Sequence, residues 1–194
     1  MHSRLMHRFA YGISQVFCPP CVAIGGMLLA AAAHPSPQGW LCAGTYIVLA
    51  VLGPLLMLFW LMSRGEVSDL DVTQREERYK PFIVAVCGAA VAWSILSVLE
   101  APGLQVQFAA AHAAVISIIV VITLYWKISV HAASAASLAT LVSALLEAKL
   151  LAILPVPVLV VAWSRLYLGR HTLAQVVAGG VLGAVVFGAF LLAR

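Results

Sequence analysis

Long apolar runs fill most of this sequence, and only short polar stretches separate them. Of the 194 residues, 63% are hydrophobic and 9% are charged, whereas a soluble domain carries about 25% charged residues. Runs of about 20 residues cross the roughly 30 Å hydrocarbon layer of a bilayer when they are helical. These runs are continuous and rich in Ala, Leu and Val, without the alternation of a membrane β-strand. The sequence therefore predicts an all-α, polytopic transmembrane bundle, with residues 1–194 forming a single domain.

Six to seven spans are expected along the chain. They cover approximately residues 14–33, 40–62, 81–99, 105–126, 132–146, 150–163 and 176–192. Pro19 and Pro20 predict a bend in the first span, and residues 34–39, 100–103 and 147–149 predict turns. Residues 1–12 are basic, with apolar side chains on adjoining turns, which is typical of a short helix at the membrane surface. A frayed terminus is the alternative.

Three longer polar segments interrupt the apolar runs, at residues 63–80, 127–131 and 164–175. Two predicted spans separate each segment from the next, so we expect all three on one membrane face. By the same count nine of the eleven Lys and Arg residues fall on that face, and the positive-inside rule places it in the cytoplasm. Cations at helix ends suit anionic headgroups, so the expected partners are membrane lipids and not nucleic acid. We expect a multi-pass protein of a bacterial-type inner or cell membrane.

The polar segments hold side chains that can bind and attack a phosphate group. Arginine has a planar fork that matches phosphate oxygens, and two histidines can act as nucleophile and proton donor near neutral pH. His171 and Gln175 are four residues apart, on one helix face, so the amide oxygen can fix one ring nitrogen. The candidate residues are Arg75, Arg78, Lys80, Ser129, His131, Arg165, His171 and Gln175.

The third polar segment resembles a signature motif of the type 2 phosphatidic acid phosphatase (PAP2) superfamily, whose core is shared with vanadium haloperoxidases. That motif is Ser-Arg, five residues, His, three residues, Asp. Ser164, Arg165 and His171 match it at this spacing, and Gln175 stands in place of the Asp. The resemblance covers residues 69–180 and implies a PAP2/haloperoxidase-like helical core.

The other two motifs of the superfamily are matched in part. Of Pro-Ser-Gly-His, the chain keeps Ser129 and His131, with Val130 in place of Gly. The remaining motif is Lys, six residues, Arg-Pro. In this chain Lys80 and the proline after it occupy the Arg-Pro position, and Thr73 stands where the motif has its Lys. The nearby cations Arg75 and Arg78 are expected to replace the missing one.

The resemblance implies a lipid phosphatase that needs no metal and no cofactor. His171 would attack phosphorus and form a phosphohistidine intermediate, and His131 would protonate the leaving oxygen. Phosphate oxygens would be held by Arg165, Lys80, Arg75, Arg78 and Ser129. The implied substrate is a phosphate or diphosphate ester of a lipid alcohol, such as phosphatidic acid, and the extra cations favour a polyprenyl diphosphate.

Two alternative functions stay open. Replacing an orienting carboxylate by an amide lowers kcat by roughly 10⁴ in a serine protease, so Gln175 favours a non-catalytic phospholipid-binding protein with a degenerate pocket. Asp69 and Asp71 suggest a Mg²⁺-dependent prenyl transferase, although no second aspartate-rich segment accompanies them.

Several other residues are given structural roles. Cys18 and Cys21 have the spacing of a redox motif, but no charged neighbour activates a thiolate, and the prolines between them favour a kinked helix. His112 lies inside a span and is expected to form a hydrogen bond between helices. Close helix contact is expected at Gly179, Gly183 and Gly188.

Overall fold

The computed structural model describes residues 2–146 and 155–193, and all regular secondary structure in these residues is helical. This confirms the prediction of an all-α bundle with several transmembrane spans. The chain divides into two compact units. Unit 1 comprises Met1–Val22 and Lys127–Arg194, and unit 2 comprises Ala23–Trp126.

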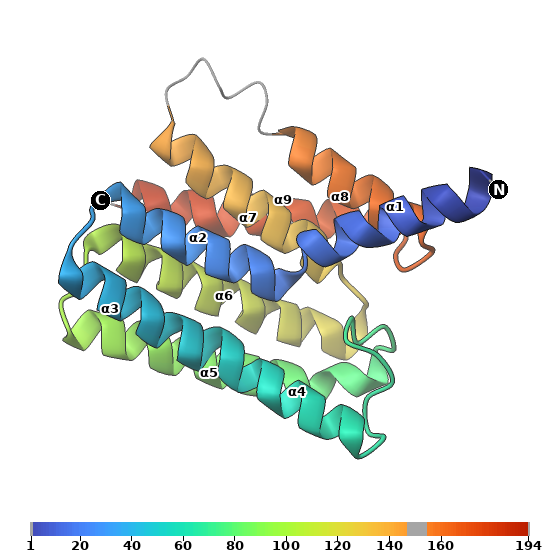
Figure 1. The fold of residues 1–194 in the computed structure, drawn as a ribbon, viewed down its shortest axis with the longest axis horizontal. Coiled ribbons are helices and arrows are strands. Elements are labelled where there is room, and N and C mark those ends of the chain that lie inside the picture. Colours follow the sequence, from blue (N-terminus) through green and yellow to red (C-terminus); the bar gives the residue numbers. More distant parts are fainter. Residues whose placement is uncertain (1, 147–154, 194) are drawn as a thin grey trace. The chain divides into compact units, whose positions relative to one another are not determined.

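Unit 2 contains the middle of the sequence. After α2 (Pro19–Ala33), whose first turn belongs to unit 1, come α3 (Pro37–Tyr46), η1 (Ile47–Leu52), α4 (Gly53–Ser63), η2 (Glu76–Arg78), α5 (Tyr79–Val98) and α6 (Gly103–Tyr125). Helices α5 and α6 run side by side (Figure 1). A hydrogen bond of 2.8 Å joins the Tyr46 hydroxyl to Nδ1 of His112, which confirms the predicted bond between helices.

Helix α3 begins earlier than the sequence predicts. Residues 34–39 are expected to form a turn, but Pro37 is the first residue of the helix. Ser36 caps it, because its Oγ accepts a hydrogen bond of 3.0 Å from the backbone N–H of Gly39. Proline is favoured at this position, where its missing N–H leaves no bond unmade.

The span expected over residues 40–62 contains a wide π-helical turn that the sequence pattern does not reveal. Pro54 cannot donate a hydrogen bond to the carbonyl four residues before it, and the preceding Gly53 donates instead to Val48, five residues back. The turn presents the carbonyl of Leu49 to α5, at Gly88, where a Cβ would clash with it. Such single wide turns occur mostly as local insertions in α-helices.

Unit 1 contains α1 (His2–Val16), α7 (Val130–Leu145), α8 (Pro155–Tyr167) and α9 (Leu173–Leu192). Helix α1 packs on α8, and α7 packs on α9. The first helix extends beyond the expected residues 1–12, and the chain then bends by 46° before α2 begins at Pro19. The bend predicted from the two prolines is therefore confirmed.

Among the described residues, four helical stretches are long and apolar enough to cross a membrane: Pro37–Ser63, Glu76–Val98, Gly103–Tyr125 and Leu173–Leu192. The bent pair Arg4–Val16 and Pro19–Ala33 could form a fifth span. The other two expected spans correspond to α7, with 16 residues, and α8, with 13. The turn expected at residues 147–149 and the start of the expected sixth span lie outside the described residues.

Candidate active site

Two hydrogen bonds join the second and third polar segments inside unit 1. Nζ of Lys127 donates to the backbone oxygen of Arg170 at 2.8 Å. The backbone N–H of Ser129 donates to the backbone oxygen of Gln175 at 3.2 Å. The residues that open α7 therefore lie against those that open α9, as the sequence predicts for these two segments.

Glycine allows this close approach of the two helices. A Cβ on Gly179 would clash with the carbonyl oxygen of Ser129, and a Cβ on Gly183 would clash with that of Ala133. Both positions confirm the predicted close contact, whereas Gly188 has no atom within 4 Å of its Cβ position. Small residues commonly let transmembrane helices approach at the backbone.

Ser129 and His131 are held by the start of α7. Ser129 is the N-cap of the helix, and its Oγ accepts a hydrogen bond of 3.3 Å from the N–H of Ala132. A serine hydroxyl that accepts at a cap still has its own proton to donate. His131 lies in the first turn and is 4% exposed, so both candidate residues are buried beside the start of α9.

A capping box fixes Gln175 at the start of α9. Thr172 is the N-cap, and its hydroxyl accepts from the N–H of Gln175, while Oε1 of Gln175 accepts a hydrogen bond of 3.1 Å from the N–H of Thr172. The sequence Thr-x-x-Gln before an apolar run is the signature of this motif, so the capping role of Thr172 could have been predicted.

The capping box also decides which atom of Gln175 faces the imidazole of His171. Nδ1 of His171 lies 3.1 Å from Oε1 of Gln175. Because that oxygen already accepts from a backbone N–H, it is the acceptor in the second bond too, and Nδ1 carries the proton. A neutral imidazole protonated on Nδ1 has its lone pair on Nε2, which leaves Nε2 as the nucleophilic atom.

Arg165 is buried near the end of α8, where its side chain is 1% exposed. One terminal nitrogen of its guanidinium donates a hydrogen bond to Oγ of Ser14, which lies in α1. The preceding residue, Ser164, donates from its hydroxyl to the backbone oxygen of Ala10 at 2.7 Å. No local pattern in the sequence indicates either contact, since each joins residues more than 150 positions apart.

The remaining candidate cations, Arg75, Arg78 and Lys80, belong to unit 2. Arg78 is 2% exposed, and its Nε donates a hydrogen bond of 2.9 Å to the backbone oxygen of Val72. Val72 has a positive φ of 43°, which is strained for a β-branched residue, and its side chain packs in a small core with Leu58 and Leu61. The buried arginine therefore supports the loop before α5.

Arg75 and Arg78 line a cavity of about 160 Å³ within unit 2. Arg75 donates to the backbone oxygen of Leu124 at 3.3 Å and lies 3.5 Å from a carboxylate oxygen of Glu76. The cavity is also lined by Thr123, whose buried hydroxyl has no hydrogen-bond partner among the described residues. Two guanidinium groups and a hydroxyl can bind an anion here, although the lining also includes Glu76. Thr123 is not among the candidate residues predicted from the sequence.

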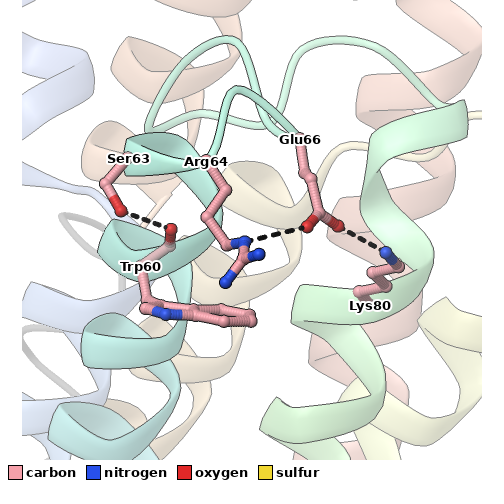
Figure 2. A network of polar contacts seen from close by, with 5 residues as sticks. All are labelled: Trp60, Ser63, Arg64, Glu66 and Lys80. Atoms are coloured by element: carbon pink, nitrogen blue, oxygen red, sulfur yellow. Dashed lines mark hydrogen bonds and ion pairs between the residues drawn. The ribbon is translucent and has the colours of Figure 1, made fainter.

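Lys80 lies in the first turn of α5 with 63% of its side chain exposed. Its ammonium group donates to the carboxylate of Glu66, which lies between Lys80 and Arg64 in Figure 2. The guanidinium of Arg64 lies in turn over the ring of Trp60, 4.9 Å from its centre. The hydrogen bond from Lys80, together with the positive charges of Lys80 and Arg64, lowers the pKa of Glu66 below its ordinary value. In this structure Lys80 thus binds a carboxylate of the same chain, that of Glu66.

The loop before α5 is tied down by further polar contacts. Glu77 accepts hydrogen bonds of 2.8 Å from both the N–H and the hydroxyl of Ser68. The hydroxyl of Thr73, at the position where the PAP2 motif has Lys, donates to Asp69 at 3.1 Å. Asp69 thus has a local structural partner.

A family profile described as the PAP2 superfamily matches residues 54–194. The match includes all three polar segments and begins after α1, α2 and α3. No curated protein and no solved structure gave a match.

Proposed function

Since the chain belongs to the PAP2 superfamily, whose members are generally phosphatases acting on phosphate esters, we propose that it is a metal-independent lipid phosphatase. Its substrate would be a phosphate or diphosphate ester of a lipid alcohol, and its products inorganic phosphate and the lipid with one phosphate fewer. The activity would be carried by His171, His131 and Gln175, with Arg165 and Ser129 holding phosphate oxygens.

The observation that carries this proposal is the contact between Oε1 of Gln175 and Nδ1 of His171. The amide supplies what the family's carboxylate supplies to a nucleophilic histidine, an acceptor that selects the tautomer and orients the ring. The N–H of Thr172 keeps the oxygen of the amide turned toward the imidazole. Departure from the motif at Gln175 is therefore compatible with a working nucleophile.

The proposed reaction has two steps. Nε2 of His171 attacks the terminal phosphorus, and the bond from this phosphorus to the leaving oxygen breaks while His131 gives that oxygen a proton. The leaving oxygen is the alcohol oxygen of the lipid in a monoester and the bridging oxygen in a diphosphate. A water molecule then attacks the phosphohistidine, His131 takes its proton, and inorganic phosphate leaves as the N–P bond breaks. Fixed positive groups that face the developing negative charge supply most of the rate enhancement in such transfers.

The lipid nature of the substrate is supported by the helices around the site. The apolar spans would hold the hydrocarbon tail in the plane of the membrane, which we propose to be a bacterial-type cell membrane. A polyprenyl diphosphate is the substrate we favour, because a diphosphate carries more negative charge than a monoester. Arg75, Arg78 and Lys80, the cations of the first polar segment, supply the additional positive charge that favours this substrate.

Phosphate release by the purified full-length protein in detergent micelles, with chelator present, tests this proposal. The substrates are phosphatidic acid, phosphatidylglycerol phosphate and a polyprenyl diphosphate, and the control is His171→Ala. We expect release by the wild type and a loss of roughly 10⁴-fold or more in the variant, as for other covalent nucleophiles. Equal release by the two proteins, or dependence on added Mg²⁺, would contradict the proposal.

A second candidate function is binding of a phospholipid without turnover. It is favoured by the same position, since Gln175 is neutral where the family has a carboxylate, and an amide cannot balance the charge of an imidazolium. In that case the purified protein would bind lipid phosphates but release no phosphate from any of them.

A further inference from the structure

The N-terminal helix α1 lies outside the residues that match the family, yet it contacts two consecutive residues of the third motif. The hydroxyl of Ser164 donates to the backbone oxygen of Ala10 at 2.7 Å. The guanidinium of Arg165 donates to the hydroxyl of Ser14. Helix α1 is therefore bonded directly to a residue that the proposed function assigns to phosphate binding.

Both contacts are made by one face of α1. Ala10 and Ser14 are four residues apart, which places them one above the other on a helix, and neither is exposed. The side chains of Leu5 and Phe9 are mostly exposed, and Arg4 and Arg8 are exposed as well. A helix with a basic, partly apolar outer surface is typical of binding at the interface of an anionic membrane.

The hydroxyl of Ser164 does not follow the usual pattern for a helical serine. Serine hydroxyls within helices commonly bond to the carbonyl four residues before them in the same helix. In this protein the hydroxyls of Ser94, Ser97, Ser117 and Ser143 do so. Ser164 instead reaches a carbonyl of α1, which indicates a specific contact between the two helices.

The bond from Arg165 to Ser14 fixes one edge of the guanidinium group. Arginine has five N–H donors in a rigid plane, and a single acceptor on one terminal nitrogen restricts the rotation of the whole plane. A long side chain that is already held in place loses less conformational freedom when it binds phosphate. We propose that Ser14 is a positioning residue that holds Arg165 in the orientation that binds the substrate phosphate. This inference rests on the proposed function, which assigns Arg165 to that phosphate.

Removal of the Ser14 hydroxyl should leave the docking of α1 intact. The ring of Phe9 lies 6.1 Å from that of Trp163 in α8, and the bond between Ser164 and Ala10 does not involve Ser14. Alanine is also the residue that helices tolerate best. Ser14→Ala therefore tests the hydrogen bond between Arg165 and Ser14.

The experiment measures the binding of inorganic phosphate to the purified full-length protein in micelles by calorimetry, alongside lipid phosphate turnover. Loss of a hydrogen bond to a charged group should weaken phosphate binding and raise KM by about tenfold, with a smaller change in kcat. Ser14→Thr, which keeps a hydroxyl, should bind within a few-fold of the wild type. Ser143→Ala, which removes a hydroxyl of α7 that bonds within its own helix, is the matched control and should be unchanged.

A double-mutant cycle distinguishes positioning of Arg165 from a general effect on structure. In an Arg165→Ala background, Ser14→Ala should have no further effect on phosphate binding, because the group it positions is gone. Wild-type affinity in Ser14→Ala, or an equal loss in both backgrounds, would overturn the inference, and so would a wild type that binds no phosphate. Phosphate binding that depends on Ser14 without any lipid turnover would instead overturn the proposed function and leave this inference standing.

Discussion

At the scale of single residues, the orientation of His171 depends on one amide oxygen. Oε1 of Gln175 accepts from both the N–H of Thr172 and Nδ1 of His171. The first bond leaves the amide no freedom to present its nitrogen to the ring. A residue that departs from the family motif can thus keep the orienting function of the carboxylate while losing its charge.

Two substitutions at position 175 distinguish the orientation of the His171 ring from the effect of a negative charge beside it. Gln175→Glu keeps the acceptor and the capping box and adds a negative charge that favours the imidazolium form of His171. The acidic limb of the kcat/KM profile against pH should therefore move to higher pH, because the nucleophile must be neutral. Gln175→Met, of similar length but without an acceptor, should lower kcat by about 10²-fold to 10⁴-fold. An unchanged kcat in Gln175→Met would show that Gln175 does not orient the ring.

Glu66 gives the loop before α5 a dependence on pH. Its pKa is lowered, chiefly by the hydrogen bond from Lys80, so the carboxylate form is favoured in the folded protein. The resulting stabilisation is present above the pKa of the unfolded chain and is lost as pH falls through the lower folded pKa. In Glu66→Gln the thermal midpoint should fall less than in the wild type between about pH 6 and pH 3. Glu100→Gln, which removes a carboxylate elsewhere in unit 2, is the control and should follow the wild type. If the thermal midpoints of Glu66→Gln and the wild type fell in parallel with pH, Glu66 would not stabilise the loop.

At the scale of elements, the packing of α7 on α9 places the two histidine segments together. Gly179 and Gly183 allow the backbones to approach at Ser129 and Ala133, and the bond between Ser129 and Gln175 lies beside the first of these contacts. The geometry around His171 and His131 is therefore a consequence of helix packing.

Substitution of the glycines of α9 by alanine tests this packing. Gly183→Ala would force a Cβ against the carbonyl of Ala133, and overpacking of this kind costs about 1–3 kcal/mol. Gly188→Ala meets no atom within 4 Å and should stabilise the helix by roughly 0.5–1 kcal/mol. Thermal unfolding in micelles should place the two variants on opposite sides of the wild type. A Gly183→Ala variant as stable as Gly188→Ala would contradict the close contact.

The sequence predicts the long spans well, because the length of an apolar run depends only on consecutive residues. It also predicts the bend before Pro19 and the existence of the polar segments. It did not reveal the wide turn at Ile47–Leu52, because that turn depends on how Pro54 is accommodated, nor the early start of α3 at Pro37. For the candidate site, spacing identified His171 and Gln175 as neighbours. The contact of Arg165 with Ser14 depends on the docking of α1 on α8, which leaves no local pattern.

At the scale of the whole molecule, charge is distributed unevenly between the two units. Unit 1 carries seven of the eleven Lys and Arg residues and one of the seven Asp and Glu residues. Unit 2 carries the other six acids, and three of its four cations, Arg64, Arg75 and Lys80, form ion pairs with glutamates. The unit that contains both candidate catalytic histidines therefore has an excess of positive charge, whereas unit 2 has an excess of negative charge. A positive excess suits a site for an anionic headgroup.

The order of spans and polar segments along the sequence predicts that the three polar segments share one membrane face. In a cysteine-free background, Leu70→Cys and Arg170→Cys should react with an impermeant thiol reagent from the same side of a vesicle. His34→Cys, which one span separates from the loop containing Leu70, should react from the other side. Labelling of Leu70→Cys and Arg170→Cys from opposite sides would separate the cations of unit 2 from the histidines.

The most direct test of the account is to trap the covalent intermediate during a single turnover of a lipid labelled on its phosphate. We expect label on the protein that is stable in base and labile in acid, as for a phosphohistidine, that maps to His171 and that is absent from His171→Ala. Label on any other residue, or full turnover by His171→Ala, would contradict the central claim that Nε2 of His171 is the nucleophile.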